Sequence, residues 1–208
     1  DQTIQILSTQ KEDLLKRWGN SILSNATWTS PDRNLTSHIF WQAFYGARPI
    51  TIGVTGGSCT AGYGVGEKAT WVHLFADWLN ETLPPTSPAT LRNAAQPSTG
   101  TALSAPCMET YLGSDADVDL LFWEHTINDY LMQIATPQMM NLWLSRAMHL
   151  YPRAAVGIVY LWDAYAMTNL RNSAERAMHP AVISAGLNGL DVFSISGATL
   201  AVQSNLTG

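Results

Sequence analysis

The chain contains the segment Pro49-Ile50-Thr51-Ile52-Gly53-Val54-Thr55-Gly56-Gly57-Ser58, in which β-branched residues lead straight into two glycines and a serine. This pattern predicts a short buried strand that ends in a sharp turn. Similar apolar runs follow at residues 90–94, 118–124, 154–161 and 190–195. Apolar residues at helical spacing lie between them, at residues 71–83, 137–150 and 180–187. The alternation predicts a five-stranded parallel sheet inside a three-layer α/β/α sandwich.

The region before this alternation differs in character. Residues 1–47 are rich in aromatic side chains and read as helical, including a helix at residues 37–45. We expect them to form a helical N-terminal extension packed on a single domain of residues 48–208. No repeat or linker divides the chain further.

Charge and hydropathy exclude several classes of protein. Eleven basic and 16 acidic residues give a net charge of −5 without a basic stripe, so we expect no nucleic-acid partner. No apolar run approaches the roughly 18 residues of a transmembrane segment. The histidines and acidic residues never fall at metal-ligand spacing, so we expect no metal site. A phosphate-binding loop needs a lysine, and a dinucleotide loop needs a glycine at Ser58, so we expect no cofactor.

Small features favour a secreted location. Asn-x-Thr sequons occur more often than chance predicts, and they make four asparagines glycosylation candidates: Asn25, Asn34, Asn80 and Asn205. The chain opens on Asp1, so we expect a processed N-terminus. Cys59 and Cys107 are either bridged in an oxidising compartment or two buried thiols.

Functional groups of open α/β sheets gather at the carboxyl ends of the strands. That rule selects the loops that begin at Gly56, Ala95 and His125. In the first loop, Ser58 follows a glycine pair and is exposed near backbone amides that can stabilise an anion. In the third, the Asn128 amide can donate to a developing negative charge, and Asp129 can fix the loop by bonding backbone amides. The alternatives are an ordinary glycine-rich turn and an Asn-Asp pair that caps a turn.

Three blocks in order resemble the GDSL/SGNH hydrolases: Gly57-Ser58 with Thr60-Ala61-Gly62, Asn93-Ala94-Ala95 leading to Gly100, and Ile127-Asn128-Asp129. The likeness is strongest to secreted eukaryotic members and covers residues 48–200. It implies a flavodoxin-like fold in which Ser58 is the nucleophile. The Ser58 amide, the Gly100 amide and the Asn128 side chain would then form the oxyanion hole, with Gly57 and Asp129 as supporting residues.

The family's Asp-x-x-His block is missing after the last predicted strand. His179-Pro180 resembles its end, but Arg176 stands where the aspartate belongs, and His125 is a loop histidine of the kind that usually packs or faces solvent. We therefore expect none of the five histidines beside Ser58, and an Asp-x-x-His block soon after Gly208 in a longer parent protein.

Two functions follow from this sequence. The first is a serine ester hydrolase that acts on a small ester or an O-acylated glycan, such as an O-acetyl ester, through a Ser58 acyl-enzyme. The second is an inactive binding or structural module of an extracellular assembly, with other glycoproteins as partners. A covalent serine probe separates the two.

Overall fold

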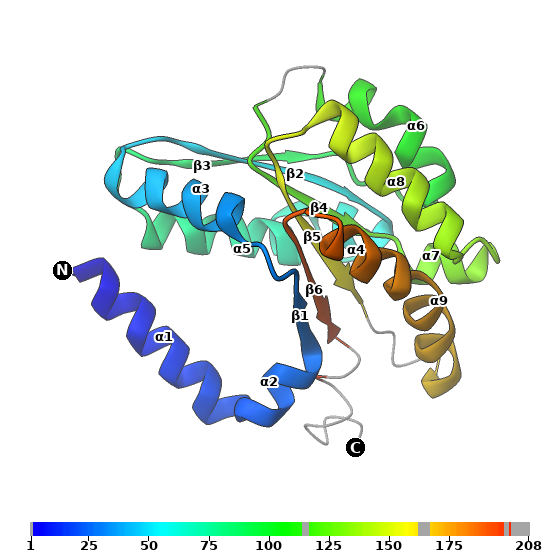
Figure 1. Ribbon diagram of the computed structural model, residues 1–208, viewed down its shortest axis with the longest axis horizontal. Helices are drawn as coiled ribbons and strands as arrows, with labels where there is room; N and C mark the ends of the chain where they lie inside the picture. Colours follow the sequence, from blue (N-terminus) through cyan, green and yellow to red (C-terminus); the bar gives the residue numbers. More distant parts are fainter. Residues whose placement is uncertain (1, 114–116, 162–166, 198–199, 201–208) are drawn as a thin grey trace.

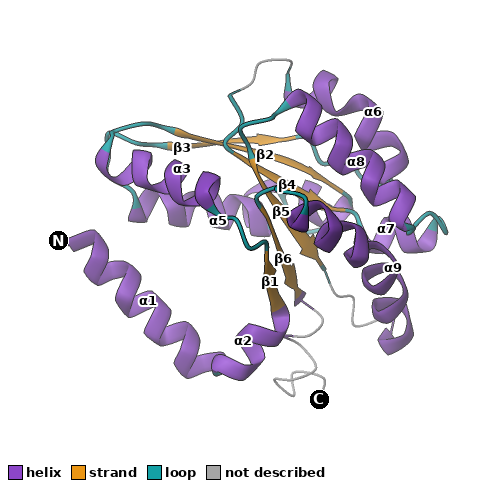
Figure 2. Ribbon diagram, in the orientation of Figure 1, coloured by secondary structure: helices purple, strands orange, loops and turns teal. Residues whose placement is uncertain are grey.

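The computed structural model describes residues 2–113, 117–161, 167–197 and 200. It is a three-layer α/β/α sandwich, as predicted, with helices on both faces of a twisted sheet (Figure 1, Figure 2). The strand order is β1-β6-β5-β4-β2-β3. The strands are β1 (Thr27–Thr29), β2 (Ile50–Gly56), β3 (Ala89–Asn93), β4 (Leu120–Glu124), β5 (Ala155–Tyr160) and β6 (Val192–Ser196).

The five predicted parallel strands are β2 to β6, and the sheet has one strand more than predicted. This is β1, which lies in the extension and pairs antiparallel with β6, Trp28 opposite Ser194. A Thr-Trp-Thr run suits a strand, and by pairing here it covers the edge of β6. The rest of the extension is helical: α1 (Gln2–Trp18), α2 (Asn20–Ala26) and α3 (Asn34–Tyr45).

Two hydrophobic cores lie on the two faces of the sheet. One packs α3 and α5 (Trp71–Thr82) against residues such as Ile52 and Phe122. The other packs α6 (Thr101–Leu112), α8 (Pro137–Leu150) and α9 (Met167–Leu187) against residues such as Trp123 and Ile158. Because both faces are covered, β2, β4 and β5 are buried almost throughout.

Three short helices complete the described chain: α4 (Ser58–Ala61), η1 (Glu67–Ala69) and α7 (Thr126–Leu131). Among the residues that the structure places, no helix has the length and hydrophobicity to cross a bilayer. α4 and α7 begin at the carboxyl ends of the neighbouring strands β2 and β4, where Gly56 pairs with Glu124. The segment after β3 lies at the same edge, since the main-chain N–H of Gln96 donates to the Gly56 carbonyl at 2.9 Å.

Candidate active site

The Ser58 turn is shaped by its two glycines. β2 ends at Gly56, and Ser58 is the first residue of α4. A Cβ on Gly57 would lie 2.6 Å from Oδ1 of Asn128, and one on Gly56 would lie 2.6 Å from Cβ of Thr60. Gly57 has φ −88°, so the glycine is needed for space and not for its backbone angle. The pair therefore lets Asn128 approach on one side of the turn and Thr60 on the other.

The three predicted oxyanion residues lie on adjoining segments. The Asn128 side chain rests on Gly57, next to Ser58. Gly100 precedes the first residue of α6, and a Cβ there would lie 2.5 Å from Oδ1 of Asp129. Asn128 and Asp129 are consecutive in α7, so α7 contacts both other segments. The structure brings all three to the carboxyl edge of the sheet, and Ser58 is half-buried there.

The Asp129 carboxylate bonds the start of α6, and not its own loop as we expected. It accepts the main-chain N–H of Thr101 at 2.7 Å and the Thr101 hydroxyl at 2.5 Å. The Thr101 hydroxyl in turn accepts from the indole of Trp123 at 2.8 Å. Burial raises the pKa of Asp129 to about 6, and the two bonds from Thr101 oppose that rise. The carboxylate thus fixes the start of α6, where an anion is favoured by the helix dipole.

Sequence reasoning missed a second arrangement of the same kind. The Thr60 hydroxyl donates to Oε2 of Glu124 at 2.7 Å and accepts from the indole of Trp71 at 2.9 Å. Burial raises the pKa of Glu124 to about 8, because the hydrogen bonds from Thr60 and nearby amides offset desolvation only in part. The available signal was a charged residue that ends an otherwise apolar strand, Leu120-Leu121-Phe122-Trp123-Glu124.

None of the histidine rings hydrogen-bonds the Ser58 hydroxyl in the part of the chain that the structure describes. The His125 ring is 1% exposed, and its Nδ1 lies 3.3 Å from the Thr99 carbonyl. Burial lowers the pKa of His125 to about 4, so the ring is neutral. His179 lies 3.4 Å from the Tyr160 hydroxyl. The Nδ1 atoms of both rings thus have partners other than Ser58, while the buried Nε2 of His125 has no hydrogen-bond partner among the described residues.

Of the two alternatives for the cysteines, the structure has thiols and no bridge between Cys59 and Cys107, although Cys59 is not buried. Cys59 is exposed on α4, and Cys107 is half-buried midway along α6. They belong to helices that follow different strands. Across the described ranges, no three His, Cys, Asp or Glu side chains are grouped as a metal ion would require.

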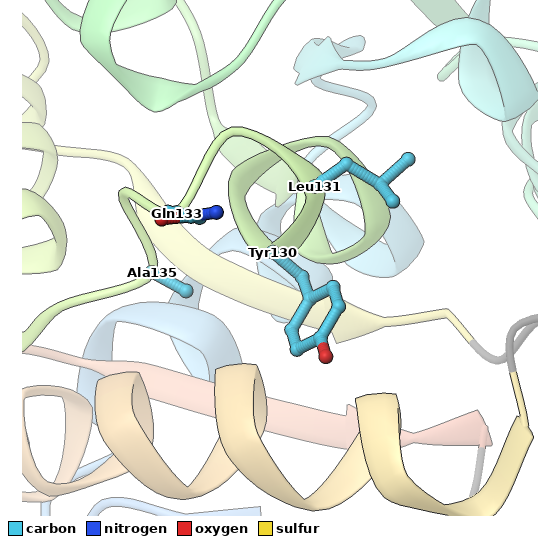
Figure 3. Close-up of a pocket in the computed structure, with 4 residues that line it drawn as sticks. All are labelled: Tyr130, Leu131, Gln133 and Ala135. Atoms are coloured by element: carbon cyan, nitrogen blue, oxygen red, sulfur yellow. The ribbon is translucent and has the colours of Figure 1, made fainter.

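A cavity of about 400 Å³ is lined by residues that follow Asn128 and Asp129 in the chain. Tyr130 and Leu131 of α7 line it together with Gln133 and Ala135 of the following segment (Figure 3). The Tyr130 ring projects from α7 towards α9, a helix that α7 contacts. Gln133 has a φ of 57°, which is uncommon for a residue with a side chain. The cavity offers an aromatic face from Tyr130 and an amide from Gln133.

Comparisons with known proteins were made for sequence and for structure. No family model and no curated protein matches the sequence. A solved two-domain esterase active on acetylated mannans, co-crystallized with mannopentaose, is similar with a TM-score of 0.69 at 18% identity, over 86% of this chain and 47% of that one. This chain thus spans less than half the length of that esterase.

Two smaller proteins are similar as well. The esterase EstA from Pseudoalteromonas sp. has a TM-score of 0.54 at 17% identity, over 76% of this chain and 84% of that one. A member of the lipolytic G-D-S-L family from Veillonella parvula has a TM-score of 0.52 at 18% identity, over 69% and 76% of the two chains. At these identities the likeness concerns architecture, and this chain has the fold of the GDSL/SGNH esterases.

Proposed function

We propose that this protein hydrolyses carboxylic esters through an acyl-enzyme on Ser58. The observation that carries the proposal is the Asn128 amide resting on Gly57, beside a serine that starts a helix at the carboxyl edge of the sheet. A nucleophile and a side-chain amide that meet at such an edge are the parts that acyl transfer needs. The GDSL/SGNH fold supports the same function.

The proposed reaction uses Ser58, Gly100 and Asn128. The Ser58 oxygen attacks the ester carbonyl carbon while its proton passes to a base, and negative charge develops on the carbonyl oxygen. The main-chain N–H groups of Ser58 and Gly100 and the Asn128 side chain stabilise this charge. The base then protonates the leaving alcohol, and water releases the acid from Ser58. Because no described histidine hydrogen-bonds the Ser58 hydroxyl, the proposal requires a base from another segment, such as the family's Asp-x-x-His block.

For the substrate we propose an O-acetylated glycan outside the cell. The similar two-domain esterase acts on acetylated mannans, and it covers most of this chain. The cavity lined by Tyr130 and Gln133 supports the choice, since the Tyr130 ring can stack on a sugar and the Gln133 amide can bond its hydroxyls.

The test uses the full-length parent protein, with the segment that supplies the base. It compares wild type with Ser58→Ala and Asn128→Ala on acetylated mannan and on a nitrophenyl acetate. We expect Ser58→Ala to abolish turnover, and Asn128→Ala to lower kcat by about 100- to 1000-fold, the usual loss for one oxyanion donor. A fluorophosphonate probe should add its mass to wild type, and to the control Ser98→Ala, but not to Ser58→Ala. Wild type that neither turns over nor reacts would favour the non-catalytic binding module.

A further inference from the structure

The Glu124 carboxyl group lies against the turn that carries Ser58, although the reaction proposed above does not use it. Glu124 ends β4, is 2% exposed and faces Gly56 across the sheet. Its main-chain carbonyl accepts the Gly57 N–H at 2.9 Å. The amides of Gly57 and Thr126 also act on its carboxyl group. Glu124 therefore contacts the Ser58 turn through both its main chain and its side chain.

Thr60 connects the carboxyl group to the helix that Ser58 begins. An indole N–H can only donate, so the Thr60 oxygen accepts from Trp71 and its own hydrogen is left for Glu124. Thr60 is fully buried, and the missing side chain of Gly56 makes the room for it. The orientation of α4 is thus set by a chain of directed hydrogen bonds that ends at Glu124.

We propose that Glu124 is a positioning residue for Ser58, holding the serine and its main-chain N–H in the arrangement that an ester carbonyl requires. It acts through Thr60 and Gly57 and not on the ester itself. This inference rests on the proposed function, because it assigns a role within the same site.

The protonation state of Glu124 matters for that role. With its pKa raised to about 8 by burial, the carboxyl group is neutral at pH 7. The titratable group that acts on it is Asp129 on α7, whose charge raises that pKa further, and His125 is the next residue in the chain. A neutral acid places no negative charge beside the developing oxyanion. Ionisation at higher pH would add a negative charge there and destabilise the transition state.

The experiment measures kcat/KM from pH 6 to 10 for wild type, Glu124→Gln and Glu124→Ala. Glutamine keeps the shape and the neutral hydrogen bonds, so Glu124→Gln should match wild type at pH 7. Above pH 8 wild type should fall by about tenfold per pH unit, while Glu124→Gln should not show that fall. Glu124→Ala should lose about 10- to 100-fold at every pH, since the turn is no longer held. The control Asp119→Asn, a buried carboxyl at the other end of β4, should keep the wild-type pH profile.

A second readout does not depend on turnover. Folded Glu124 keeps its proton to about pH 8, whereas an unfolded glutamate releases it near 4.5. The Tm of wild type relative to Glu124→Gln should therefore fall as the pH rises from about 5 to 8. Wild type without turnover contradicts the proposed function. Turnover with the same pH profile in wild type and Glu124→Gln contradicts the positioning role alone, as does a Glu124→Ala that loses Tm but keeps kcat/KM.

Discussion

Thr60 and Thr101 play matching parts at the two helices that begin beside Ser58 and Gly100. Each hydroxyl accepts from a tryptophan indole and donates to a buried carboxyl group, Glu124 in one case and Asp129 in the other. The directions of the bonds are fixed, because tryptophan cannot accept. The starts of α4 and α6 are thus fixed by the same pattern of hydrogen bonds. Each pattern depends on one carboxyl group of the β4–α7 segment.

Burial lowers the pKa of His125, whereas it raises the pKa values of Glu124 and Asp129, and this gives a testable prediction. Its ring is buried and neutral, with the pKa lowered to about 4. The unfolded chain binds a proton near pH 6.5, so the stability that His125 contributes is present above that pH. It is lost as the pH falls through about 4, by roughly 3 kcal/mol at most.

We therefore expect His125→Gln, whose amide can still bond the Thr99 carbonyl, to resist acid better than wild type. Thermal unfolding at pH values from 7 to 4 measures this. The Tm of wild type should fall more than the Tm of His125→Gln as the pH is lowered. His149→Gln, at an exposed position late in α8, is the control and should leave the slope unchanged. Parallel curves for wild type and His125→Gln would refute the argument.

The elements that the sequence predicted best carry their own local signals. α8 runs from Pro137 to Leu150 as expected, because Thr136 caps its first turn and Pro137 suits its first position. The start of α9 was not predicted. Pro180 read as a helix start, but the helix begins at Met167 and continues through the proline. The sequence therefore predicted the start of α8, which a local hydrogen bond fixes. It missed the start of α9, because the proline that usually marks a helix start lies inside that helix.

The packing of β5 against its two neighbouring strands depends on Gly157, which gives another testable prediction. Gly157 in the middle of β5 leaves space for two rings in edge contact, Phe122 of β4 and Phe193 of β6, whose centroids are 5.8 Å apart. A Cβ there would lie 2.4 Å from the Phe122 ring. Gly157→Ala should therefore lower the free energy of unfolding by about 1–3 kcal/mol, the usual cost of overpacking. Denaturant unfolding checks this, and in a Phe122→Leu background the added cost should shrink. An unchanged cost there would mean that the ring contact is not its source.

Across the whole molecule, the sequence predicted a parallel sheet covered on both faces and the edge at which the candidate site residues lie, since both follow from parallel α/β topology. It did not predict that part of the extension joins the sheet. Only the partner strand β6 makes residues 27–29 a strand, and that partner lies more than 160 residues later in the chain. Glu124 was missed for the same reason, because Thr60 and Trp71 reach it from distant segments.

The exposure of the sequon asparagines makes the proposed secretion of the protein testable. Asn25 lies exposed on α2 and Asn34 lies exposed at the start of α3. Asn80 is exposed too, but its side-chain nitrogen donates to the Ala89 carbonyl and its oxygen accepts the Ala89 N–H. Asn205 lies outside the described residues. If the protein is secreted, as we propose, Asn25 and Asn34 should carry glycan at higher occupancy than Asn80, whose amide is already engaged.

Glycopeptide mass spectrometry on protein from its native source measures these occupancies. Thr27→Ala and Thr36→Ala remove the sequons at Asn25 and Asn34, and each should abolish the glycan at its own asparagine only. Thr36 also bonds Asp191, at 2.7 Å from its hydroxyl, so Thr36→Ser is the control that keeps both the sequon and the hydrogen bond. An unmodified chain would contradict the secreted location. Equal occupancy at Asn80 would contradict the argument from its two hydrogen bonds to Ala89.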